Sequence, residues 1–417
     1  MAVKPGYKLT EVGVIPEDWE TTPLGDIFVF KNGLNKSKEY FGHGSPIVNY
    51  MDIYTKSGLN TSDLIGRVLL TKQEIDLFRV AKGDVFFTRT SETVDEIGLT
   101  AVLLEDSQDT VFSGFVLRAR PINNSLTDNF KKYCFSSSTV RKQIVKKSTY
   151  TTRALTNGKH LSSVILPLPP LPEQTAITTA LSDVDSLISS LDALISKKKQ
   201  IKQGAMQELL SGKRRLPGFS GEWEVKRLWD VALIKTGARN NQDKVEDGVY
   251  PFFVRSENIE RINSYCYDEE AILVPGEGRI GDIFHYIHGR FDVHQRVYVI
   301  NQFSKDVFAK FIYFYLVKYF GKHAMQNTVK ATVDSLRLPT FQKFEITIPP
   351  QLTEQQAIAA ILSDMDAEIT TLESRRNKTK LLKQGMMQEL LTGRIRLPIA
   401  KHHMVSDRTN PTVETRQ

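Results

Sequence analysis

The residues that could do chemistry fall into few of the patterns that catalysis requires. Gly276, Gly278 and Gly281 have the spacing GxGxxG after a predicted strand, which resembles a dinucleotide-binding fingerprint. That fingerprint needs a helix after the glycines and an acidic residue about 20 positions later. Here a strand is predicted instead. We therefore interpret this segment as a tight turn that presents Arg279.

His285, His288 and His294 are close in sequence, but two of them are three residues apart in a predicted strand. Such residues point to opposite faces, so ordinary structural histidines are favoured over a metal site. No Gly-Lys pair is followed by Ser or Thr, as a phosphate-binding loop would require. The chain also contains no Asp/Asn-Pro-Pro-Tyr/Phe tetrapeptide of amino-group methylation and no GxSxG. We expect no catalytic residue, no bound cofactor and no metal in this chain.

Two polar loops, at residues 148–161 and 327–338, carry hydroxyls and basic groups. Such groups contact phosphates and base edges in nucleic acids. Ordinary surface loops have the same composition, so that interpretation stays open. Basic residues in or beside turns complete the set of candidate DNA-binding residues. The set is Arg89, Ser148, Thr151, Arg153, Arg279, Lys330 and Thr332.

The element that must position these loops is a long amphipathic helix that occurs twice. The segment from Glu173 to Leu210 recurs from Glu354 to Leu391, a shift of 181 residues, and about half of the positions are identical through Pro217 and Pro398. Apolar residues alternate in steps of four and three, which is a heptad seam. The seam residues are Ile177, Leu181, Val184, Ile188, Leu191 and Ile195 in the first copy and Ile358, Leu362, Met365, Ile369 and Leu372 in the second.

Each seam must be buried, and an intramolecular antiparallel pair of the two helices buries both. The alternative is two separate surface helices, each on its own domain. Gly204 and Gly385 occupy the same place in the two copies. Glycine costs a helix about 1 kcal/mol, so we expect either a close backbone crossing or a kink there.

Each helix is preceded by a region of mixed strands and short helices that opens in a similar way. Trp19 and Trp223 correspond, and we interpret both as core anchors. The sequence predicts an α+β protein with two α/β domains separated by two long helices that form an intramolecular antiparallel coiled coil, in a pseudo-two-fold repeat. The predicted boundaries are 1–170 and 216–350 for the domains, 171–215 and 351–398 for the helices, and 399–417 for a disordered tail.

Composition limits the classes of function. The chain has 417 residues and a net charge of +7, but no region forms a dense basic arm. A DNA-binding role must therefore depend on shape, base contacts or a partner's charges. Cys134 and Cys266 are far apart and lack metal-ligand neighbours, which favours a reduced, cytoplasmic protein. We see no apolar run of signal-peptide or membrane-spanning length, so no membrane contact is expected.

The order domain, helix, domain, helix resembles the DNA-specificity subunit of a Type I restriction–modification enzyme over Lys4 to Pro398. The motifs that carry this resemblance are GYKLTEVGVIPEDW near the start, the LPEQ and TEQ helix starts, and the KQG…MQELLSGKRRLP and KQG…MQELLTGRIRLP helix ends. The paired turns TRTSETVDEIG and VPGEGRIGD add to it.

The resemblance implies a non-catalytic subunit that binds double-stranded DNA. Each recognition domain would read one half of a bipartite target, and the helices would set the spacer between the halves. The implied partners are two methyltransferase (modification) subunits and restriction/translocase subunits, which would use S-adenosylmethionine, ATP and Mg²⁺. The alternatives are a fused methyltransferase or nuclease and a coiled-coil scaffold without DNA specificity.

Overall fold

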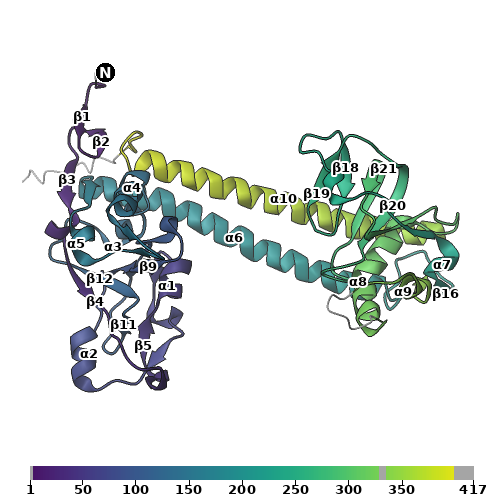
Figure 1. The fold of residues 1–417 in the computed structure, drawn as a ribbon, viewed down its shortest axis with the longest axis horizontal. Coiled ribbons are helices and arrows are strands. Elements are labelled where there is room, and N and C mark those ends of the chain that lie inside the picture. The colour runs from purple at the N-terminus through teal and green to yellow at the C-terminus, as the bar shows by residue number, and fades with distance from the viewer. Residues whose placement is uncertain (1–2, 328–334, 399–417) are drawn as a thin grey trace, which may run out of the picture. The chain divides into compact units, whose positions relative to one another are not determined.

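A computed structural model of the protein describes residues 3–327 and 335–398 (Figure 1). The chain divides into two compact units, each treated separately below. Unit 1 comprises Met1–Ser189 with Asn377–Gln417, and unit 2 comprises Ser190–Arg376. Each long helix therefore contributes one part to unit 1 and the other part to unit 2. The predicted disordered tail, 399–417, lies outside the described residues.

Unit 1 is built around a five-stranded sheet with the order β4-β12-β8-β10-β6, accompanied by smaller sheets β11-β5-β7, β13-β14-β9, β15-β3 and β1-β2. Its strands are β1 (Tyr7–Thr10), β2 (Gly13–Pro16), β3 (Glu20–Pro23), β4 (Phe28–Asn32), β5 (Phe41–Val48), β6 (Gly58–Leu59), β7 (Arg67–Val68), β8 (Val85–Thr88), β9 (Thr90–Ser91), β10 (Thr100–Leu103), β11 (Val111–Phe112), β12 (Val116–Pro121), β13 (Thr149–Tyr150), β14 (Ala154–Leu155) and β15 (Ile165–Leu168). Its shorter helices are α1 (Tyr50–Thr55), α2 (Lys72–Phe78), α3 (Asp128–Cys134), α4 (Ser138–Lys147) and α5 (Gly158–Ser162).

Unit 2 contains a six-stranded sheet with the order β17-β22-β20-β21-β18-β19, and a separate pair β16-β23. Its strands are β16 (Glu224–Arg227), β17 (Leu233–Thr236), β18 (Tyr250–Phe253), β19 (Ile259–Ile262), β20 (Tyr267–Pro275), β21 (His285–Val293), β22 (Val297–Asn301) and β23 (Glu345–Ile348). Its shorter helices are α7 (Leu228–Val231), α8 (Ala309–Asn327) and α9 (Leu338–Gln342). The order β17-β22-β20 at one edge of this sheet matches the order β4-β12-β8 at one edge of the main sheet of unit 1.

The long helices α6 (Leu171–Leu209) and α10 (Leu352–Leu390) pack together in an antiparallel sense within each unit. In unit 1, Lys383 Nζ lies 2.6 Å from Asp185 Oδ1. In unit 2, Lys198 Nζ lies 2.7 Å from Glu368 Oε1, and the next ion pairs join Lys202 to Asp366 and Arg376 to Asp192. As the residue number of the α6 partner rises from 192 to 202, that of the α10 partner falls from 376 to 366, so the two helices run in opposite directions. The α+β class and the pairing of the long helices are therefore confirmed.

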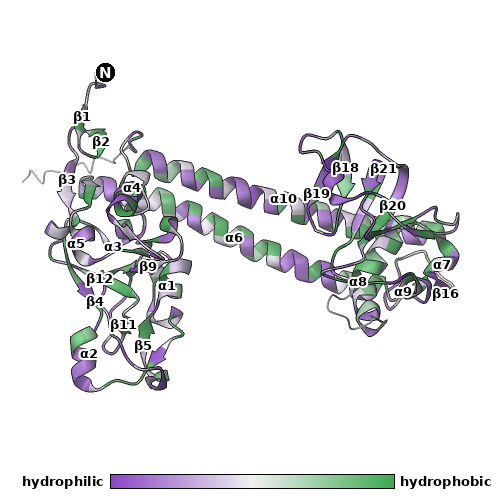
Figure 2. Cartoon of the chain, in the orientation of Figure 1, coloured by the Kyte–Doolittle hydropathy of each residue, from purple (hydrophilic) through white to green (hydrophobic). Residues whose placement is uncertain are grey.

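Apolar contacts supply most of the stability of this pairing, because exposed ion pairs contribute only about 0–1 kcal/mol each. Figure 2 shows apolar residues interleaved with polar ones along both helices. Within the seam, Ile177, Leu181, Leu191 and Ile195 of α6 are buried, and Val184 and Ile188 are half-buried. In α10, Ile358, Leu362 and Ile369 are buried, and Met365 and Leu372 are half-buried.

The expectation of a close backbone crossing at the helix glycines is wrong. A side-chain carbon added at Gly204 or Gly385 would meet no atom of the described chain within 4 Å. Both glycines lie on exposed surface. Packing within this chain therefore does not explain them.

A buried glutamate fixes the first turn of each long helix. Glu173 is 1% exposed and accepts a bidentate hydrogen bond from Arg396, with Nε–Oε1 and Nη2–Oε2 distances of 2.9 and 2.6 Å. Glu354 is fully buried and accepts the same bidentate bond from Arg215 at 2.6 and 2.7 Å. Each arginine follows the end of the other long helix. Such fork-to-carboxylate pairs are the strong, directional kind of ion pair.

The tryptophans differ between the units although their positions correspond. Trp19 is fully buried and its indole N–H donates to Glu173 Oε2 at 2.8 Å. Trp223 is half-buried, and its indole nitrogen has no hydrogen-bond partner among the described residues. Both rings pack against the hydrophobic core of their unit, as predicted.

The glutamine that follows each glutamate ties the helix to the domain that precedes it in sequence. Gln174 Oε1 accepts from the backbone N–H of Thr127, and its Nε2 donates to the carbonyl of Ser125. Likewise, Gln355 Oε1 accepts from the backbone N–H of Phe308, and its Nε2 donates to the carbonyl of Asp306. The LPEQ and TEQ motifs thus describe one structural device used twice.

In the described part of the chain, no helix has the length and apolar character needed to cross a membrane.

Arg396→Ala leaves the buried Glu173 carboxylate without its cation, and we expect it to destabilise unit 1 by about 3–5 kcal/mol. Hydrogen exchange of the amides of residues 171–181 reports the opening of that unit. Arg394→Ala is the matched control, because Arg394 pairs with the partly exposed Glu389 on the surface. Equal losses of protection in the two variants would contradict a special role for the buried pair.

Candidate nucleic-acid interface

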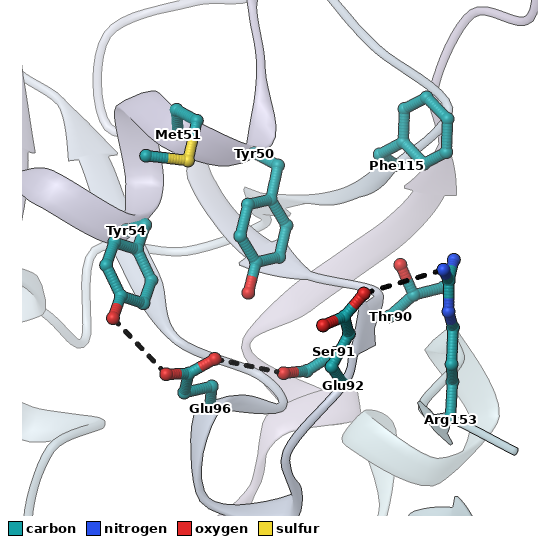
Figure 3. Close-up of a pocket in the computed structure, with 9 residues that line it drawn as sticks. All are labelled: Tyr50, Met51, Tyr54, Thr90, Ser91, Glu92, Glu96, Phe115 and Arg153. Carbon is teal, nitrogen blue, oxygen red and sulfur yellow. Dashed lines mark hydrogen bonds and ion pairs between the residues drawn. The ribbon is translucent and has the colours of Figure 1, made fainter. Parts of the chain in front are cut away.

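Unit 1 carries a hollow of about 350 Å³ where α1, β9, the turn between β11 and β12, and the hairpin of β13 and β14 meet (Figure 3). Two tyrosines of α1, Tyr50 and Tyr54, form one wall with nearly parallel rings 6.2 Å apart. The complete lining is Tyr50, Met51, Tyr54, Thr90, Ser91, Glu92, Glu96, Phe115 and Arg153.

Large apolar side chains on this hollow are exposed to solvent. Phe115 is 66% exposed, Met51 60% and Tyr54 47%. Scattered apolar residues are normal on a protein surface, but a group around a hollow with a polar rim is typical of a binding surface. The arrangement therefore indicates that this face of unit 1 meets another molecule.

The polar groups of the hollow pair with one another. The Tyr54 hydroxyl donates to Glu96 Oε1 at 3.2 Å, and the Ser91 hydroxyl donates to Glu96 Oε2 at 3.3 Å. The Glu96 charge raises the pKa of Tyr54, so this hydroxyl remains a donor. Arg153 lies 3.6 Å from Glu92, and both are largely exposed. Such a pair contributes little to stability, so Arg153 can exchange Glu92 for another acceptor at small cost.

The predicted residues of unit 1 have different local roles. Arg153 and Thr151 are exposed on the short hairpin of β13 and β14. Arg89 is half-buried behind the turn of Phe115: its backbone N–H donates to the Phe115 carbonyl, and its guanidinium reaches the Gly114 carbonyl at 3.4 Å. Ser148 donates its hydroxyl to the Ile144 carbonyl in the last turn of α4. Arg153, Thr151 and Arg89 therefore gather near the hollow, whereas the Ser148 hydroxyl donor is already used within the chain.

In unit 2, the predicted Arg279 is exposed in the loop between β20 and β21. It pairs with Glu257 at 2.9 Å and with Asp282 at 3.6 Å. Arg255 and Arg296, which the sequence analysis did not select, share Glu277 at 2.9 and 2.8 Å. Lys330 and Thr332 lie outside the described residues. The backbone N–H of Leu336 donates to the Gly276 carbonyl at 2.8 Å, just as the N–H of Thr156 donates to the Arg89 carbonyl in unit 1.

The histidines near this face do not add positive charge. His285 approaches the Ser256 carbonyl at 3.1 Å, and burial lowers its pKa. Burial also lowers the pKa of His294, whose Nδ1 accepts from the backbone N–H of Arg296. Both rings are therefore neutral near pH 7. Within residues 3–327 and 335–398, no three His, Cys, Asp or Glu side chains are grouped to hold a metal ion.

Comparison with known proteins places this arrangement in a family. The family model described as the Type I restriction modification DNA specificity domain matches twice, at residues 16–203 and 220–381. The chain belongs to this family. Its role is DNA sequence specificity. The two matches cover most of both recognition domains and much of both long helices.

Curated relatives agree with this assignment, and a solved structure has a similar fold. The putative type I restriction enzyme MjaX specificity subunit of Methanocaldococcus jannaschii is 27% identical over 94% of this chain and 97% of that relative. The EcoDI specificity subunit of Escherichia coli is also 27% identical, over 41% of this chain and 37% of its own length. The fold is similar to a crystal structure of the S subunit from M. genitalium, with a TM-score of 0.59 and 14% identity over 94% of this chain and 98% of that chain.

Arg153→Ala is expected to weaken target binding by the complete restriction–modification complex. If the guanidinium contacts a base, the loss is about 1–3 kcal/mol and appears only on the target; if it contacts a phosphate, all duplexes lose affinity about equally. Fluorescence anisotropy on target and scrambled duplexes measures both. Ser148→Ala is the control, because its hydroxyl donates to Ile144. If Ser148→Ala weakens binding as much as Arg153→Ala, the two residues have been assigned to the wrong roles.

Proposed function

We propose that the protein reads a bipartite target in double-stranded DNA, with unit 1 reading one half-site and unit 2 the other. The observation that carries this proposal is the repeated recognition domain. The two units share a strand arrangement and a helix attachment, but the side chains on their exposed turns differ. In unit 1 the turn between β11 and β12 exposes the apolar Phe115, whereas in unit 2 the corresponding turn carries Arg296 paired to Glu277. A shared frame with different surface chemistry suits two different short sequences.

The long helices set the distance between the half-sites in this proposal. Each contains 39 residues, which is about 58 Å of α-helix. Their equal length and shared seam suit a spacer element. A helix with a buried seam resists bending, and this property would keep the spacing of the target constant.

The helices also offer two equivalent docking sites, which suits two methyltransferase subunits. Ile201 and Leu382 are 181 residues apart and occupy the same place in the repeat. They are 47% and 59% exposed. Each lies three residues before an exposed glycine, Gly204 or Gly385, that has open space around it. A glycine retained on an open helix face permits the close approach of another backbone.

The chain supplies binding energy and geometry, while partner subunits supply the covalent chemistry. In this division of labour, the methyltransferase subunits use S-adenosylmethionine on adenine, and the restriction/translocase subunits use ATP and Mg²⁺. The contacts that this chain makes to DNA select the site on which those reactions occur. A domain exchange tests whether each unit reads its own half-site.

Replacing residues 20–165 with the same domain of a relative is expected to change one half-site and leave the other half-site and the spacer unchanged. The reason is that these residues include the hollow and hairpin of unit 1 but neither long helix. Methylation mapping in cells that express the partner subunits measures the result. An unchanged target would show that unit 1 reads neither half-site, and a change in both half-sites would refute one unit per half-site.

Ile201→Ser and Leu382→Ser are each expected to remove one methyltransferase subunit from the complex, and the double variant both, because each removes an apolar contact from one docking site. Native mass spectrometry measures the stoichiometry. Leu381→Ser is the matched control: Leu381 is 68% exposed, but its counterpart in the repeat is the polar Gln200. Full assembly of the double variant would exclude this helix face as the docking site.

A further inference from the structure

Phe115 and Arg296 occupy the same position in the two units, and the backbone demonstrates this. Each is the third residue of a three-residue turn, and four backbone hydrogen bonds around the two turns match one for one. In unit 1 the backbone N–H groups donate to carbonyls as follows: Gly114 to Leu34 at 2.7 Å, Ser113 to Val48 at 3.0 Å, Val116 to Ser113 at 3.1 Å, and Arg89 to Phe115 at 3.1 Å. In unit 2 the matching backbone bonds, in the same order, run from Gln295 to Arg239 at 2.8 Å, His294 to Phe253 at 3.0 Å, Val297 to His294 at 2.9 Å, and Gly276 to Arg296 at 2.8 Å.

These hydrogen bonds hold both turns against their sheets, so the side chain at the tip projects from a defined backbone. Glycine is required beneath each turn: a side-chain carbon at Gly33 would lie 2.1 Å from the Ser113 carbonyl oxygen, and one at Gly237 would lie 2.2 Å from that of Val293. The surrounding frame therefore accepts different residues at the tip without changing its own geometry.

The two tips differ completely in chemistry. The Phe115 side chain has neither a donor nor an acceptor and lines the same hollow as Met51 and Tyr54, which are also exposed. Arg296 donates to Glu277 Oε1 at 2.8 Å, and Arg255 donates to Glu277 Oε2 at 2.9 Å. Unit 2 thus presents donors next to a carboxylate, with the Arg296 and Arg255 side chains 58% and 51% exposed.

The edges of base pairs match these two chemistries in different ways. A side chain without polar hydrogen-bonding groups can distinguish bases in the major groove by contact with the thymine methyl group. Arginine bonds to guanine O6 and N7, and glutamate accepts from cytosine N4. An Arg–Glu pair can therefore read both partners of one G·C pair.

We infer that residues 115 and 296 are matched specificity-determining positions: Phe115 contacts a thymine methyl group in one half-site, and Arg296 with Glu277 reads a G·C pair in the other. This inference rests on the proposed function, because it requires each unit to face its own half-site. It goes beyond that function by assigning a base chemistry to one residue of each unit.

The test combines side-chain and base substitutions in the assembled complex. After methylation mapping has defined the target, each thymine of the half-site read by unit 1 is replaced singly by deoxyuridine, which lacks the methyl group. One replacement is expected to weaken wild-type binding about fourfold, the value of one buried methyl-sized group. The same replacement should have no effect on Phe115→Ala.

The second arm replaces each guanine of the half-site read by unit 2 with 7-deazaguanine, which lacks the N7 acceptor. One replacement is expected to weaken wild-type binding at least about fivefold. It should have no effect on Arg296→Ala. Val29→Ala, a substitution of an exposed apolar residue on β4 outside the hollow lining, is the control and should keep both base effects.

The outcomes separate this inference from the proposed function. If the complex methylates no bipartite site, the proposed function fails. If it binds a bipartite site but Phe115→Ala and Arg296→Ala keep every base-analogue effect, only this inference fails. It also fails if either variant weakens target and scrambled duplexes equally, which would indicate a contact that carries no sequence information.

Discussion

Glu173 and Glu354 are excluded from water in the first turns of the two long helices, and a buried carboxylate is tolerated only when its charge is matched. Arg396 and Arg215 match it, and each comes from the segment that follows the other helix. The positive end of the helix dipole adds a further favourable interaction. Each unit is thus closed by a bond between the start of one long helix and the exit of the other.

The apolar contacts around these pairs have the same organisation. The main core of unit 1 combines Trp19 and sheet residues with Ile177 and Leu181 of α6 and Leu390 of α10. The main core of unit 2 combines sheet residues with Met206 of α6 and with Ile358 and Leu362 of α10. A recognition domain therefore never packs on one long helix alone. This shared packing orients each exposed turn relative to the helices that hold its unit.

Much of the fold could be predicted because it depends on local periodicity and on an internal repeat. The heptad seams and both helix starts were visible in the sequence, but the Arg396–Glu173 bond joins residues 223 positions apart, and no local pattern reports such a contact. A backbone crossing was one of two explanations offered for Gly204, and the open space around that residue excludes a crossing within this chain. In the candidate site, Arg153 and Arg279 could be chosen because basic residues in polar loops are conspicuous. Phe115 could not, since an apolar residue between two strands is normally part of a core.

Unit 1 consists of two stretches that are distant in sequence, and this affects when it can fold during synthesis. Its recognition domain is synthesised before unit 2, but the segment that completes it, Asn377–Gln417, is synthesised after the whole of unit 2. Unit 2 consists of the single stretch Ser190–Arg376, so Arg215 and Glu354 are both present before Arg396 leaves the ribosome. Domains generally fold from the N-terminus during synthesis. Here the second unit can close first, and the first unit must wait, with the Glu173 carboxylate unmatched, until Arg396 has left the ribosome.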